Sequence, residues 1–178
     1  MGIENGVQRM KKGWREKLWV EFERDRGVSV MTTAKDDDDG TEPFKDLKEL
    51  EIDNHTASEE NLQLFLEHIR SPKGKNALKR LEIVKVFFNA QKAEILAQAL
   101  SLPSCTIEEL VFDKCRAKST EMSLIFGALA QNKSVASLTL KFMNIPMNSL
   151  TTMVNMFSVN HTLEMLTLYN MGLTDASI

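Results

Sequence analysis

The sequence predicts an α/β repeat fold in which short parallel strands alternate with helices. An apolar-x-x-apolar-x-apolar pattern occurs five times, and its first positions lie 31, 29, 28 and 28 residues apart. Between these segments, apolar residues recur at the three-to-four spacing that is typical of amphipathic helices. The five predicted strands carry Leu47/Leu50/Ile52, Leu78/Leu81/Ile83, Ile107/Leu110/Phe112, Val135/Leu138/Leu140 and Leu163/Leu166/Leu168.

The composition favours a single folded domain that neither binds nucleic acid nor spans a membrane. A chain of 178 residues with 43% hydrophobic content is expected to form one buried domain. Its net charge of -3, from 22 basic and 25 acidic residues, is too small and too mixed to favour nucleic-acid binding. Only two cysteines occur, and no apolar run approaches the roughly 18 residues that cross a bilayer. We therefore expect a cytoplasmic protein that neither spans a membrane nor binds nucleic acid.

The N-terminal residues 1–31 are predicted to form a helical cap over the uncovered end of the first repeat. Apolar residues follow helical spacing over 7–24, and a short segment at 28–30 can add a capping strand. Alternatively, this helix lies on a membrane surface or binds an acidic partner, through the basic side chains beside Trp14 and Trp19. The apolar positions of this helix are Val7, Met10, Trp14, Leu18 and Phe22.

Residues 32–43 are predicted to be an exposed acidic loop, because they contain few apolar residues and the run Asp36–Asp39. Four adjacent aspartates do not have the alternating ligand spacing of a calcium loop, and Gly40 follows all of them. The repeats are therefore expected to occupy residues 44–178.

Each predicted strand is followed by a helix with one apolar stripe. Residues that can accept hydrogen bonds from free backbone N–H groups precede or open these helices, namely Ser58, Asn89, Ser119 or Thr120, and Asn148. The predicted stripes are Leu62/Leu66/Ile69, Ala93/Ala97/Leu100, Met122/Phe126/Leu129 and Leu150/Val154/Phe157.

Alternating strands and helices with a period of 28 to 29 residues resemble the ribonuclease-inhibitor-like leucine-rich repeats. Asn132 and Asn160 strengthen the resemblance, because each lies where that family has an asparagine before the next strand, and asparagine tolerates the left-handed conformation that ends helices. The resemblance implies a right-handed horseshoe-shaped solenoid over residues 44–178, with parallel strands on the concave side and helices on the convex side. The expected solenoid has five degenerate repeats, of which the last is incomplete.

The sequence departs from that family at the position after each strand, where an asparagine or cysteine usually bonds the turn. Only Cys115 fits, so we expect apolar packing instead of a polar ladder, with Cys115 buried and Cys105 exposed. The positions concerned are His55, Val86, Cys115, Met143 and Met171.

Catalytic motifs are not found in the sequence. It contains no phosphate-binding glycine loop, paired-cysteine zinc pattern or nucleophile elbow. Of its three histidines, His161 lies more than 90 positions from His55 and His68, in a different repeat. We therefore expect no metal, no cofactor and no enzymatic activity. The favoured function is a protein-interaction module or scaffold. The alternative is the substrate-recognition or regulatory portion of a larger enzyme, such as a ubiquitin ligase, whose catalytic domain lies outside this chain.

The predicted binding surface is the concave strand face, onto which the residues between the inward leucines project. Its fifteen positions include six acidic and two basic residues, a net charge of -4, with the acids in the first three strands. A basic protein segment is expected to dock here, with Met165 and Tyr169 as anchors; the alternative is that these charges serve solubility only. The predicted contacts are Glu49, Glu51, Asp53, Arg80, Glu82, Glu109, Asp113, Lys141, Met165 and Tyr169.

The fifth repeat stops at Ile178 without a recognisable terminal cap, and Leu163, Leu166 and Leu168 would be left uncovered. The sequence therefore predicts either continuation into a longer array or self-association through this end.

Overall fold

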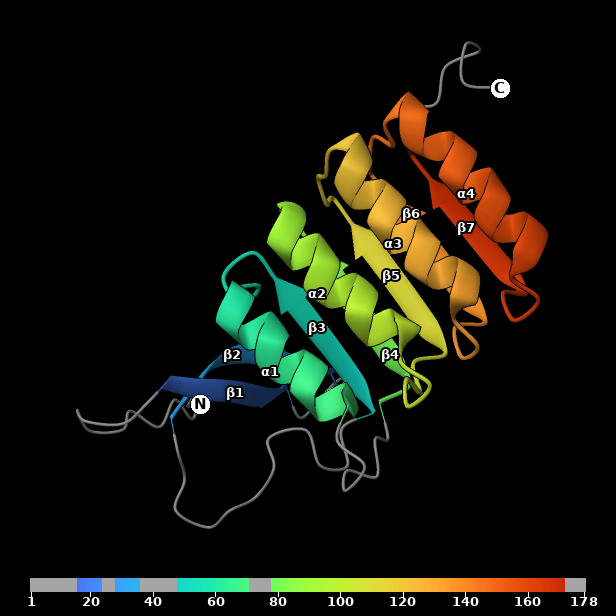
Figure 1. The fold of residues 1–178 in the computed structure, drawn as a ribbon. Helices are drawn as coiled ribbons and strands as arrows, with labels where there is room; N and C mark the ends of the chain where they lie inside the picture. The colour runs from blue at the N-terminus through green and yellow to red at the C-terminus, as the bar shows by residue number, and fades with distance from the viewer. Residues whose placement is uncertain (1–15, 24–27, 36–47, 71–77, 172–178) are drawn as a thin grey trace, which may run out of the picture.

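The computed structural model describes residues 16–23, 28–35, 48–70 and 78–171, which form one sheet with helices between its strands (Figure 1). The strands follow chain order across the sheet; β1 and β2 are antiparallel, and β2 to β7 are parallel. The elements are β1 (Glu16–Glu23), β2 (Val28–Lys35), β3 (Glu49–Asp53), α1 (Glu59–Arg70), β4 (Arg80–Val84), α2 (Ala90–Ser101), β5 (Glu109–Asp113), α3 (Ser119–Gln131), β6 (Ser137–Lys141), α4 (Met147–Val159) and β7 (Met165–Tyr169).

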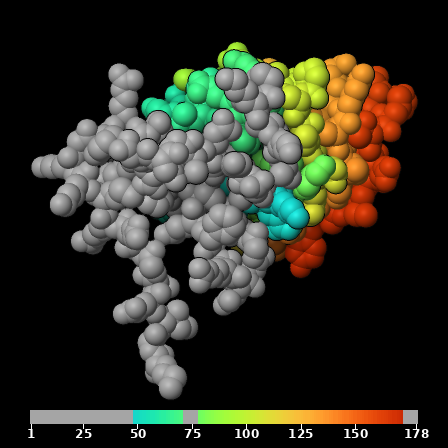
Figure 2. All heavy atoms as spheres, turned by 90° about the horizontal axis from the view of Figure 1, so that it is seen from below, coloured from blue at the N-terminus to red at the C-terminus, as the bar shows by residue number. Residues whose placement is uncertain are grey.

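Strands β3 to β7 have five residues each and pair in register. We call a strand with the helix after it a unit. Equivalent strand positions of successive units therefore form a row across the sheet. Leu50 pairs with Leu81, and Ile52 with Ile83; all four are at most 1% exposed. The described helices lie side by side on one face of the sheet (Figure 1), and from residue 48 onward the units occupy successive bands (Figure 2). The predicted alternation of parallel strands and helices is confirmed.

The helix predicted over 7–24 is wrong for Glu16–Glu23, which form strand β1; residues 7–15 lie outside the described residues. In this segment Leu18, Val20 and Phe22 recur at every second position, and a β-branched valine with two aromatics favours a strand over a helix. The extra strand expected at 28–30 is confirmed and runs to Lys35 as β2. The loop predicted over 32–43 is therefore wrong for residues 32–35, and residues 36–43 lie outside the described residues.

Two helix starts match their predicted caps. The Ser58 hydroxyl accepts a hydrogen bond from the Asn61 N–H at 3.1 Å, and the Asn89 side chain accepts one from the Lys92 N–H at 2.8 Å. Helix α3 begins at Ser119 without a side-chain cap. The start predicted at Asn148 is wrong, because Pro146 already occupies the cap position of α4, and its fixed φ suits a helix start.

A left-handed residue follows each of the strands β4 to β7, namely Lys85, Lys114, Phe142 and Asn170, with φ between 50° and 57°. This conformation costs a residue with a side chain roughly 1 kcal/mol. For the first three residues the cost is offset by a hydrogen bond to the next strand, such as Lys85 N–H to the Asp113 carbonyl at 2.7 Å. Main-chain hydrogen bonds thus continue the alignment of units beyond the strand ends.

Asparagine side chains join the units at the helix exits. Asn132 is 4% exposed; its amide donates to the Leu100 carbonyl at 2.6 Å, and its oxygen accepts from the N–H groups of Ser134 and Val135. Asn160 repeats this arrangement one unit later and donates to the Leu129 carbonyl at 2.5 Å.

The left-handed conformation predicted for the two asparagines is wrong. Asn132 and Asn160 have φ of -68° and -84° with extended ψ. Asparagine stabilises these positions through its side chain and not through an unusual backbone conformation. Each side chain forms hydrogen bonds with buried main-chain groups on two successive units.

The apolar packing expected after the strands is present, since Val86, Cys115, Met143 and Met171 are all buried. His55 differs from these residues, because it is exposed. The Asp53 carboxylate accepts hydrogen bonds from the N–H groups of His55 and Thr56, and Thr56 is buried in this tight turn. The exposure predicted for Cys105 is wrong, because its side chain packs into the core at 7% exposure.

Burial raises the pKa of the Cys115 thiol to about 12, although backbone hydrogen bonds partly oppose the shift. The S–H donates to the Ile83 carbonyl at 3.1 Å. Because the unfolded thiol ionises near pH 9 and the buried one does not, its stabilisation is complete below about pH 9 and is lost as pH rises towards about 12. Between about pH 8 and about pH 10.5 we expect the wild-type free energy of unfolding to fall by about 2 kcal/mol more than that of Cys115→Ala.

Urea denaturation of both proteins across this pH range measures the difference. Parallel pH curves would contradict the burial of an un-ionised thiol at this position. Any change that other titrating groups cause is common to both curves and cancels.

Candidate functional site

The sheet face opposite the described helices carries the ten residues predicted to bind a partner. The strand register places its fifteen side chains in three rows that run across β3 to β7. The rows are Glu49, Arg80, Glu109, Ser137, Met165; Glu51, Glu82, Val111, Thr139, Thr167; and Asp53, Val84, Asp113, Lys141, Tyr169.

The two basic residues of this face pair with two of its acids. Arg80 lies 2.5 Å from the Glu82 carboxylate and 3.4 Å from that of Glu109. Lys141 lies 4.0 Å from Glu82, so this glutamate is shared between two bases. Such partly exposed pairs contribute at most about 1 kcal/mol each to stability, but they neutralise the middle of the face.

Three of these acids lie at the β3 edge of the face, where Glu49 and Glu51 are half-buried and pair in register with Arg80 and Glu82 of β4. Asp53 bonds its own turn, as described above. Asp113 is half-buried with one carboxylate oxygen fully covered. The six acids of the face lie on β3, β4 and β5, as the sequence predicts.

The β7 edge of the face carries no charged residue and is more open. Met165 and Tyr169 are each 58% exposed, whereas Val111 and Thr139 in the middle row are buried. The Tyr169 ring packs edge-on against Phe142 with 5.1 Å between centroids. The proposed anchor residues are therefore accessible, and one of them is held by an aromatic neighbour.

A groove of about 1080 Å³ that sequence reasoning missed lies along the turns that follow β3 to β6. The bases Lys85, Lys114 and Arg116 line it together with the exposed rings of Phe87 and Phe142. A sequence signal exists, because Lys85 and Lys114 lie 29 residues apart at one position of the repeat, as do Phe87 and Arg116 at another. The register of the strands brings these positions together in one groove, and the sequence spacing alone does not show this.

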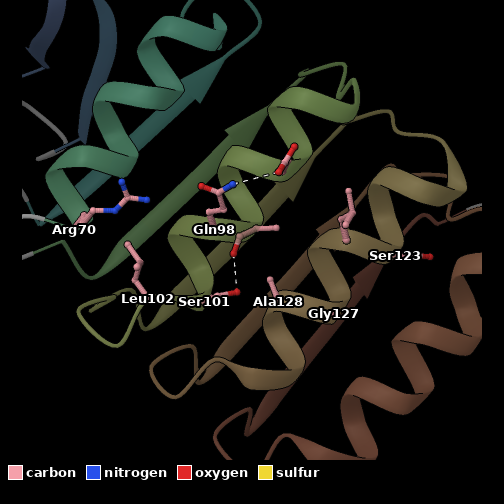
Figure 3. Close-up of a pocket in the computed structure, with 10 residues that line it drawn as sticks. Arg70, Gln98, Ser101, Leu102, Ser123, Gly127 and Ala128 are labelled. Atoms are coloured by element: carbon pink, nitrogen blue, oxygen red, sulfur yellow. Dashed lines mark hydrogen bonds between the residues drawn. The ribbon is translucent and has the colours of Figure 1, made fainter.

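A second hollow, of about 670 Å³, lies on the helix layer between α2 and α3 (Figure 3). Small residues leave the space, and a methyl group added at Gly127 would meet no heavy atom within 4 Å. Arg70, Glu94 and Gln98 lie at its rim, where the Gln98 amide donates to Glu94 at 3.4 Å. The hollow combines a polar rim with an apolar floor, and its charges nearly balance.

The end of the array formed by α4 and β7 is more exposed than the units before it. Leu166 and Leu168 are 38% and 40% exposed, although the equivalent Leu138 and Leu140 of β6 are fully buried. On α4 the predicted stripe Leu150/Val154/Phe157 is wrong at Val154 and Phe157, which are exposed. Leu150 is partly buried against the core, and Ser149, Met153 and Met156 are buried. The equivalent stripe of α3, Met122/Phe126/Leu129, is buried in the core, and no described helix follows α4. Continuation or self-association through this end stays a prediction.

Among the described residues, no group of three or more histidine, cysteine, aspartate or glutamate side chains could hold a metal ion, and no helix is both long and apolar enough to cross a membrane. No protein-family model matches the chain, and no curated protein matches it significantly.

Proposed function

We propose that this chain is a protein-interaction module without catalytic activity of its own, and that it binds a basic protein segment on the sheet face opposite its helices. The observation that carries the proposal is the charge on that face, where six acids and two bases share fifteen aligned positions. Protein partners recognise such surfaces by electrostatic steering and by a few exposed aromatic or methionine anchors.

The two halves of the face have different roles in this proposal. The β3 edge, with Glu49 and Glu51, attracts lysine and arginine side chains of the partner. The open β7 edge, with Met165 and Tyr169, offers apolar contact for the same segment. Five strands spaced by about 4.8 Å give a surface about 19 Å wide, which about six residues of an extended segment can cross.

We also propose that the units belong to a right-handed leucine-rich-repeat solenoid of the ribonuclease-inhibitor-like kind. The in-register parallel strands, the helices on one face and the recurring asparagines at 132 and 160 support this architecture. In such an array the strand face is the long continuous surface, which fits its proposed role in binding.

The test uses a fluorescent peptide rich in lysine and arginine, whose binding to the chain is followed by fluorescence anisotropy. Replacing Glu49→Lys and Glu51→Lys should raise its Kd by about tenfold or more, because two attractive charges become repulsive. The matched control is Glu60→Lys with Glu67→Lys on the exposed side of α1, which changes the net charge equally. Equal weakening by both variants would refute binding on the sheet face, as would failure of the wild type to bind.

A further inference from the structure

The groove along the turns that follow β3 to β6 has a charge opposite to that of the sheet face beside it. Its lining includes Lys85, Lys114 and Arg116 and no acidic residue. The three bases come from only two successive units, and all are exposed. A surface with this concentration of one charge favours a ligand of the other.

The bases are held on a rigid part of the molecule. Lys85 and Lys114 occupy the left-handed position after their strands, where their N–H groups bond the next strand at 2.7 and 2.9 Å. Arg116 lies in a parallel bridge with Phe87; its N–H donates to the Val86 carbonyl and its carbonyl accepts from Phe88. The main chain that presents the charges is therefore ordered before a ligand arrives, which reduces the entropy lost on binding.

Aromatic rings flank the bases on both sides. Phe87 is 54% exposed and Phe142 is 42% exposed, although most phenylalanines of the described chain are buried. Lys114 lies over the Phe142 ring, with its ammonium nitrogen 5.1 Å from the ring centroid. The groove thus offers apolar contact as well as positive charge, a combination that suits a side chain such as leucine or phenylalanine between carboxylates.

We propose that this groove is a second binding site, which takes a short acidic peptide segment with an apolar residue at its centre. Three spacings of about 4.8 Å separate β3 from β6, so about four extended residues fill the groove. A peptide fits better than a nucleic acid, because Asp53 and Asp113 end their strands beside the groove and would repel a continuous phosphate backbone. Arg116 can bind a carboxylate through two N–H groups, while the two lysines supply point charges.

The experiment measures the binding of a fluorescent peptide of aspartate and glutamate around one phenylalanine to the full chain. Replacing Lys85, Lys114 and Arg116 together with glutamine should raise its Kd by about tenfold or more. The matched control replaces Lys48, Arg70 and Lys133 with glutamine; these are exposed bases outside the groove, and we expect a change below about threefold. A second variant, Phe87→Ala with Phe142→Ala, keeps every charge and should also weaken binding.

The proposal is overturned if the wild type does not bind the peptide, or if the groove and control variants weaken binding equally. It is also overturned if a peptide with asparagine and glutamine in place of its acids binds equally well. Tighter binding of a single-stranded oligonucleotide through the same three bases would contradict it too. Circular dichroism confirms that each variant is folded. The Glu49→Lys, Glu51→Lys variant should retain the acidic peptide. Failure of the groove proposal is therefore distinguishable from failure of the sheet-face proposal.

Discussion

Replacing Phe88 with alanine should lower the free energy of unfolding by about 4 kcal/mol, the largest effect that we expect of a single substitution in this chain. Phe88 is 1% exposed and lies at the boundary between two units. Its ring packs edge-on against the fully buried Phe112 of the next strand, with 6.1 Å between centroids. The substitution would leave a cavity between units that the aligned main chain cannot close, because Phe88 N–H is bonded to the Arg116 carbonyl.

Phe87 provides the control for this prediction, because it is the same residue type one position earlier and its side chain is 54% exposed. Phe87→Ala should change the free energy of unfolding by about 0.5 kcal/mol or less. Chemical denaturation followed by circular dichroism measures both variants. Similar losses at the two positions would contradict the assignment of inward and outward side chains in this turn.

Asn132→Ala should cost about 3 kcal/mol, although the residue is polar and the new side chain is small enough to fit. The substitution leaves the Leu100 carbonyl and the N–H groups of Ser134 and Val135 without the partner that now satisfies them. Buried main-chain groups without partners are costly, and here they lie on two units at once. Loss of Asn132 should therefore also loosen the contact between α2 and the strand that follows α3.

The matched control is Asn155→Ala, since Asn155 is exposed on α4. Its effect on the free energy of unfolding should stay within about 0.5 kcal/mol. Hydrogen exchange adds a local readout, because the Val135 N–H should exchange much faster in Asn132→Ala than in the control. A loss for Asn132→Ala no greater than for Asn155→Ala would show that the side-chain bonds contribute little.

Periodicity is what made most of the fold predictable. The inward residues Leu81, Leu110 and Leu138 recur at nearly constant intervals, and a regular pattern of buried positions leaves few ways to arrange strands and helices. The N-terminal segment had no such constraint. Its apolar residues fit a helix at one spacing and a strand at another, and pairing with β2 decides between them.

The candidate sites were predictable to different degrees. The sheet-face residues follow from the strand pattern alone, but the pairing of Arg80 with Glu82 and Glu109 depends on side-chain geometry that spacing does not contain. The turn groove was not predicted, because no glycine marks the left-handed positions at Lys85 and Lys114. Hydrogen bonds to the next unit stabilise that conformation, and such bonds are a property of the assembled array.

The left-handed residue after each of the strands β4 to β7 also bears on how a chain of this kind can change length. Main-chain hydrogen bonds set the alignment of one unit on the next, and residues as different as lysine, phenylalanine and asparagine occupy the left-handed position. Duplication or loss of one whole unit would restore every such bond, whereas an insertion of one residue inside a strand would turn the inward leucines that follow it in that strand to the other face. Viable length variants of this protein should therefore differ by steps close to one repeat, and new binding surface can arise by duplication without redesign of the core.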